Sequence, residues 1–79
     1  MTSPDAWVLD NTIQQFAKAL AFKLAKAEEK YGWGGAWLEE SCVPAMREDL
    51  RKHIEKGDPL DVAAFAMFLW YHGATTNEG

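Results

Sequence analysis

The sequence predicts an all-α single domain, a three-helix antiparallel bundle that homodimerisation completes. Two observations support this class. Apolar residues recur at helical spacing through residues 13–31 and again through residues 42–56, which indicates two amphipathic helices. A third segment, residues 59–72, starts with a helix-start signal and then stays apolar almost throughout. The 79 residues have the length of one domain (residues 1–79), and we expect residues 74–79 to form a flexible tail.

The first helix has a start signal, a continuous apolar face and an end signal. Thr12 and Gln15 have the spacing of a capping box, in which two side chains satisfy the free N–H groups of a helix start. Gly32 provides the C-cap. We therefore expect this helix to begin at Thr12 and to pack on the core through one stripe, which consists of Ile13, Phe16, Ala17, Leu20, Leu24, Ala27 and Tyr31.

Two features lie outside this stripe. A short helical turn is expected to begin at residues 3–5 and to fold Trp7 and Leu9 back on the core. Phe22 lies on the side of the first helix that should face water. An apolar side chain at such a place is where a partner would bind.

The second helix follows a tight glycine-rich connection, in which Trp37 and Leu38 should form a short helical turn. Pro44 would break a helix interior, so we place it in the first turn, with Ser41 as the N-cap. Gly57 ends the helix. Its buried face is predicted to consist of Val43, Met46, Leu50 and Ile54.

The third helix begins clearly and is apolar on every side. Asp58 is the predicted N-cap, and Pro59 takes the first helical position, where its missing N–H has no cost. Gly73 ends the helix. Two neighbouring helices cannot cover the whole circumference of such a helix, so the remainder must meet a second copy or a protein partner. The predicted interface residues are Phe22, Phe65, Phe68, Leu69 and Trp70.

Composition narrows the function classes. Twelve acidic against eight basic residues give a net charge of −4, which argues against direct nucleic-acid binding. No segment has the pattern of a signal peptide or of a membrane span. Cys42 is the single cysteine, so no disulfide can form within the chain, and a reducing compartment is indicated. We expect a soluble, cytoplasmic protein without a membrane partner.

Several motifs, taken in order, resemble the MazG-like all-α nucleotide pyrophosphohydrolases. These motifs are Lys30-Tyr31-Gly32-Trp33, then Met46-Arg47-Glu48-Asp49-Leu50, then the run from Lys56 to Phe68, which contains Asp-Val-Ala followed by Phe-x-Met. The resemblance extends over roughly three-quarters of the chain and is greatest with the short dATP/dGTP diphosphohydrolase-type domains of phages. It implies a helical bundle that dimerises and holds Mg²⁺ with four acids, an ExxE on one helix and an ExxD on the next.

The acids of that pattern are only partly present. Asp58 and Asp61 match the second pair in a shortened form, and Glu48 matches the first position of the first pair. The residue three positions after Glu48 is Arg51, and a cation there opposes Mg²⁺ binding. Glu48, Asp58 and Asp61 are therefore metal ligands only if the chain is an enzyme. Asp58 and Asp61 have a second explanation, a capping box that also complements the helix dipole.

Two function classes follow. In the first, the chain is a small phage-type interaction protein without catalysis and without a cofactor. A concrete form is an inhibitor of host defence of the anti-CRISPR type, which binds a host nucleoprotein complex or blocks its DNA binding. Its acidic surface would occupy a basic channel. In the second, it is a Mg²⁺-dependent (d)NTP pyrophosphohydrolase. The acidic surface is predicted to comprise Glu28, Glu29, Glu39, Glu40, Glu48 and Asp49.

Overall fold

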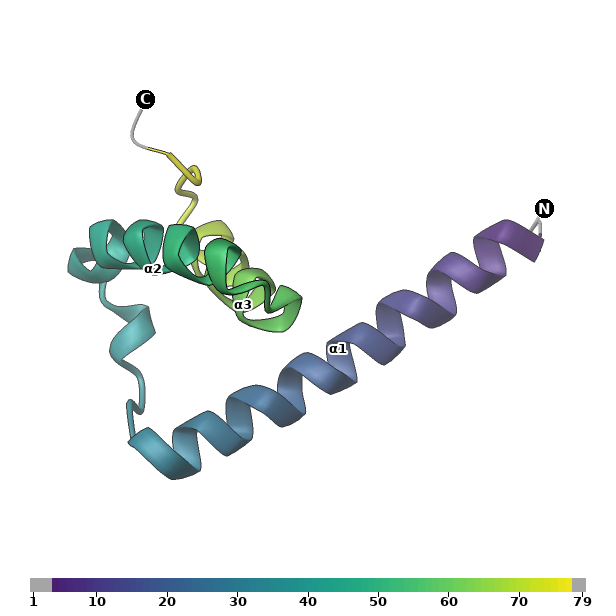
Figure 1. Ribbon diagram of the computed structural model, residues 1–79, viewed down its shortest axis with the longest axis horizontal. Coiled ribbons are helices and arrows are strands. Elements are labelled where there is room, and N and C mark those ends of the chain that lie inside the picture. The colour runs from purple at the N-terminus through teal and green to yellow at the C-terminus, as the bar shows by residue number, and fades with distance from the viewer. Residues whose placement is uncertain (1–3, 78–79) are drawn as a thin grey trace.

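The computed structural model describes residues 4–77, and the described part of the chain is helical, without a strand (Figure 1). The predicted all-α class with three helices is confirmed. No helix in this part is both long enough and apolar enough to cross a bilayer. The elements are α1 (Pro4–Tyr31), the short 3₁₀ helices η1 (Ala36–Leu38) and η2 (Glu40–Cys42), α2 (Val43–Lys56) and α3 (Pro59–Tyr71).

Helix α1 is one continuous helix of 28 residues, so its predicted start at Thr12 was wrong. The Thr12 hydroxyl instead donates a hydrogen bond to the carbonyl oxygen of Val8, at 2.8 Å, as a Thr inside a helix can do. Nothing between residues 6 and 11 breaks a helix, so the chain stays helical from Pro4 onward. Trp7 and Leu9 do not fold back on the core, because their side chains are 66% and 62% exposed.

The connection from α1 to α2 is held by Glu28. Both carboxylate oxygens of Glu28 accept from the backbone N–H of Gly34, at 2.9 Å. Gly32 and Gly34 have positive φ angles of 64° and 60°, which only glycine adopts without strain. The predicted helical turn at Trp37 is confirmed as η1. Ser41 is not the N-cap of α2, because it lies inside η2 and Cys42 occupies the cap position.

Helices α2 and α3 are joined by two residues whose predicted roles are confirmed. Gly57 adopts φ 83° and closes α2, and its N–H donates to the carbonyl oxygens of His53 and Ile54. Asp58 then caps α3, since its Oδ1 accepts from the N–H of Leu60 at 3.0 Å and from that of Asp61 at 3.4 Å. Helices α2 and α3 lie side by side and form the most extensive helix contact of the molecule (Figure 1).

The core lies between these two helices. Its buried residues come from α2 (Met46, Leu50) and from α3 (Ala64, Phe68, Leu69). Leu69, at 1% exposed, is the most buried side chain among them. From α1, Leu20 and Leu24 pack against this core and are partly buried.

The first half of α1 leads away from the other helices (Figure 1). Every residue from 5 to 19 is exposed, including three apolar residues at positions i, i+4 and i+7 on one face. We call these residues, Leu9, Ile13 and Phe16, the exposed stripe. They continue the same helical face as Leu20 and Leu24, which do reach the core.

The size of the molecule reflects this extension. Its radius of gyration is 14.5 Å, whereas a compact chain of this length would have about 11.6 Å. Its accessible surface is 6090 Å², whereas a compact monomer of 8.9 kDa would expose about 4,800 Å². The chain therefore exposes about 1,300 Å² more than its mass requires.

Candidate functional site

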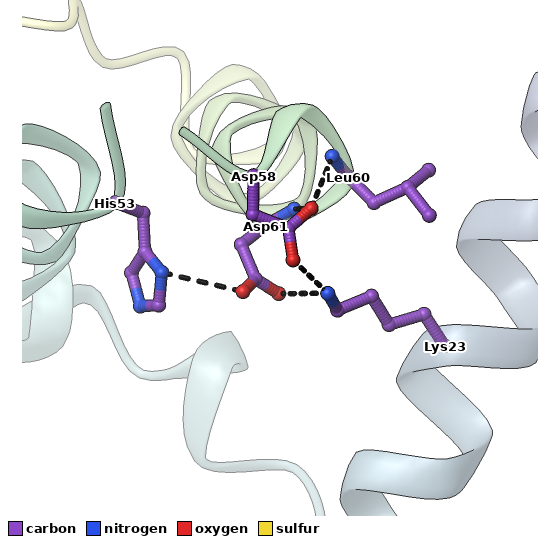
Figure 2. Close-up of polar contacts among 5 residues, drawn as sticks. All are labelled: Lys23, His53, Asp58, Leu60 and Asp61. Atoms are coloured by element: carbon purple, nitrogen blue, oxygen red, sulfur yellow. Dashed lines mark hydrogen bonds and ion pairs between the residues drawn. The ribbon is translucent and has the colours of Figure 1, made fainter. Parts of the chain in front are cut away.

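Four charged or polar side chains meet where the three helices come together, and we call them the acid–lysine cluster: Lys23, His53, Asp58 and Asp61 (Figure 2). Lys23 extends from α1 and forms an ion pair with Asp58. Its Nζ also lies 3.4 Å from Oδ1 of Asp61. On the other side of Asp61, Oδ2 lies 3.3 Å from Nδ1 of His53.

Helix geometry places these four side chains. Asp58 and Asp61 stand in the first turn of α3 because Asp58 caps it. His53 lies in the last turn of α2, just before the reversal at Gly57, so it faces that same first turn. His53 is also stacked on Phe65, with ring centroids 5.1 Å apart. Its buried Nδ1 lies near Asp61 Oδ2, but the contact does not have the geometry of a hydrogen bond.

The ion pair shifts the pKa of both partners. The hydrogen bond from Lys23 lowers the pKa of the Asp58 carboxyl, and the same bond raises the pKa of the Lys23 ammonium. Partial burial opposes both shifts but does not reverse them. The cluster therefore holds charged groups that stabilise one another, and its first role is to fasten α1 to the start of α3.

The cluster does not fit Mg²⁺. All four carboxylate oxygens of Asp58 and Asp61 already face protein partners, namely backbone N–H groups, Lys23 and His53. Glu48, the third expected ligand, pairs instead with Arg51, at 3.2 Å. Within residues 4–77, no three carboxylate, imidazole or thiol side chains are grouped closely enough to hold a metal ion. The capping role expected of Asp58 is the one that the geometry shows.

Next to the cluster, a groove of about 540 Å³ runs between the second half of α1 and α2. It combines an apolar floor with lysines at its sides, and we call it the lysine groove. Among the described residues, Lys26, Lys30 and Lys56 form no ion pair, and all three are exposed. The groove is lined by Lys23, Lys26, Ala27, Lys30, Tyr31, Trp33, Asp49, His53, Lys56, Asp61 and Phe65.

Several aromatic residues near the groove and at the end of α3 stack on one another. Trp33 lies parallel to Tyr31, with ring centroids 5.2 Å apart. Trp37 stacks on Phe68 at 5.2 Å and meets the edge of Tyr71 at 5.0 Å. His72 hydrogen-bonds the carbonyl oxygen of Trp37, at 2.7 Å, and so holds η1 to the end of α3.

The six acids expected to form an acidic surface have different surroundings. Glu28 caps the loop after α1, Glu48 pairs with Arg51, and Asp49 lines the lysine groove. The remaining carboxylates are exposed and form no ion pair within the described residues: Glu29, Glu39 and Glu40.

The expected interface has to be revised. Phe68 and Leu69 are core residues, 9% and 1% exposed, so they present little surface to a partner. Phe22 and Trp70 are exposed, at 66% and 80%, while Phe65 is half-buried at the lysine groove.

Sequence reasoning missed the upstream part of the apolar surface, where Leu9 is exposed beside Ile13 and Phe16. The signal for it was present, since Leu9 precedes Ile13 by four residues and so extends the predicted stripe by one turn.

Comparison with family models, with curated proteins and with solved structures finds no match for this chain.

Proposed function

We propose that the protein is a non-catalytic interaction module that acts as a homodimer, with α1 as the helix that joins the two copies. One observation supports this most strongly. The exposed stripe continues the face of α1 that packs on the core, yet its three apolar side chains are 41–62% exposed. An amphipathic helix gains most of its stability by packing its apolar face, so a second copy supplies what the single chain lacks.

The area is consistent with a dimer. The excess of about 1,300 Å² per chain is larger than the roughly 800 Å² that each partner buries in a standard interface. It falls in the range of obligate homodimers, whose chains each bury about 1,000–2,500 Å². In such a dimer the α1 helices would complete the antiparallel three-helix bundle that the sequence predicts.

The dimer leaves other surfaces for a target. Trp70, at 80% exposed, offers an aromatic anchor of the kind that dominates binding energy in interfaces. The free carboxylates Glu29, Glu39 and Glu40 suit a basic partner. An inhibitor of a host-defence nucleoprotein complex is the specific form of such a protein that the sequence suggests.

The test is the oligomeric state of the full chain and of one double variant. Leu9→Glu with Ile13→Glu places two carboxylates in the exposed stripe, and we expect it to convert a dimer of the 8.9 kDa chain to a monomer at micromolar concentration in light scattering. Asn11→Glu is the matched control, because it adds a carboxylate to the same helix on the opposite side.

Two outcomes would overturn the proposal. One is a wild-type protein that stays monomeric up to about 100 µM, well above the micromolar affinities typical of weak dimers. The other is robust release of pyrophosphate from a panel of dNTPs with Mg²⁺ that Asp61→Asn abolishes, since this would make the chain an enzyme.

A further inference from the structure

We infer that the lysine groove of each copy is the seat for the first four turns of α1 of the second copy, residues 4–17. This inference rests on the proposed homodimer and goes beyond it, because it names which surface of one copy receives which segment of the other. Three features of the described residues support it: charge, apolar character and symmetry.

The charges of the two surfaces are complementary. Residues 4–17 contain two carboxylates, Asp5 and Asp10, and no Lys or Arg. Lys26, Lys30 and Lys56 line the two sides of the groove without an ion pair in the described chain, and they outnumber the one unpaired carboxylate of the lining, Asp49. Lys26 and Lys30 lie only over aromatic rings, with Lys26 Nζ 5.6 Å from the Phe22 ring and Lys30 Nζ 5.2 Å from that of Tyr31. An acidic segment in the groove would give these cations their counter-charges.

The apolar features also correspond. The groove has an apolar floor to which Ala27 and Phe65 contribute, and each of these residues is half-buried. The exposed stripe presents Leu9, Ile13 and Phe16 on one side of a helix. A helix that lays such a face into a groove buries anchors at i, i+4 and i+7, which is a common mode of helix recognition.

Symmetry makes the arrangement reciprocal. In a twofold dimer the same patch serves both copies, so two α1 helices that cross antiparallel near their middle place each first half beside the second half of the other. The second half of α1 is where the groove lies. One twofold contact therefore fills both grooves and covers both exposed stripes, and neither copy is left with a free end that would continue into a filament.

Charge reversal on each side of this contact gives a direct test. Variant N carries Asp5→Lys and Asp10→Lys, and variant G carries Lys26→Glu and Lys30→Glu. All four positions are exposed, so neither variant disturbs the core. In a homodimer of either variant, residues 4–17 of each copy and the groove that receives them carry charges of the same sign. We therefore expect the dimer dissociation constant of each variant to rise at least tenfold over wild type.

The mixture of the two variants is the decisive measurement. In an N–G heterodimer, the Lys-bearing segment of N meets the Glu-bearing groove of G, and the native segment of G meets the native groove of N. We therefore expect the equimolar mixture to dimerise within about threefold of the wild-type dissociation constant. A control variant with Lys18→Glu and Glu29→Lys reverses two charges about 200° around α1 from Leu20 and Ala27, and it should leave the dimer unchanged.

The outcomes separate this inference from the proposed function. If wild type dimerises and N and G dimerise equally well, the groove is not the seat, while the homodimer stands. If N and G are weakened but their mixture shows no recovery, the two surfaces do not meet, and the inference is overturned in the same way. A wild-type monomer would overturn both. The inference is supported if the mixture dimerises like wild type while each variant by itself dimerises weakly.

Discussion

A comparison of α1 with α3 contradicts the expectation that the more apolar helix leaves more of its apolar face in solvent. Helix α3 is apolar on every side, yet most of its large side chains find partners inside the chain, and Leu69 and Phe68 form the centre of the core. Helix α1 is amphipathic, yet it leaves Leu9, Ile13 and Phe16 in solvent. How much apolar surface a helix leaves exposed is therefore determined by where its apolar face lies relative to its neighbours, and not by how apolar the helix is.

The largest expected loss of stability comes from a substitution in α3, and a matched substitution in α1 should behave differently. Leu69→Ala should lower the free energy of unfolding by about 3 kcal/mol, because it leaves a cavity in a small core. Leu9→Ala removes a side chain of the same size from α1, and its effect should depend on protein concentration, because the substitution would weaken the proposed dimer. Thermal unfolding of both variants at several concentrations measures this. If the destabilisation caused by Leu9→Ala does not change with protein concentration, Leu9 stabilises its own chain and not a dimer.

A smaller effect is expected at the junction between the two helices. Lys23→Met removes the ion pair that fastens α1 to α3, and it should lower stability less than Leu69→Ala does. The pKa of Asp58 is lowered in the folded chain, so its contribution is present above its ordinary pKa and is lost as pH falls through the lowered value. The pKa of Lys23 is raised, so its contribution is lost as pH rises through the raised value.

The difference in unfolding free energy between wild type and Lys23→Met should therefore be largest at neutral pH and shrink toward both extremes. Urea unfolding across the pH range measures it. A difference that does not change with pH would mean that the packing of the Lys23 side chain, and not its charge, fastens α1.

The smallest change in the free energy of unfolding is expected in the last turn of α3. Trp70→Ala should change the free energy of unfolding by no more than about 0.5 kcal/mol, because the side chain is 80% exposed. It should also leave the proposed dimer intact in light scattering. Loss of the dimer would place Trp70 in the contact between copies and would contradict the seat in the lysine groove.

Local signals in the sequence predicted the ends of elements well. Gly57, Asp58 and Pro59 specify the reversal between α2 and α3, because each of these residue types has a strong preference at its position. Thr12 misled because a capping residue can also bond to the carbonyl four residues before it inside a helix. Local sequence does not distinguish the two uses.

The site itself could be predicted only in part. The capping role of Asp58 follows from its position before Pro59. Its ion pair with Lys23 joins residues 35 positions apart, and no local pattern indicates which lysine of α1 reaches α3. The same holds for Phe68 and Leu69, because residues 62–71 of α3 are all apolar or aromatic and only packing decides which of them become the core.

The anchor at Lys23 also makes α1 a lever. About 19 residues separate it from the first turn of the helix, which corresponds to an arm of about 28 Å. A tilt of about 10° at the acid–lysine cluster would therefore move the start of α1 by about 5 Å, close to the pitch of one helical turn. A small change where three helices meet is thus amplified at the end of the arm, and a side chain as distant as Asp61 or His53 can set where Leu9 lies in space.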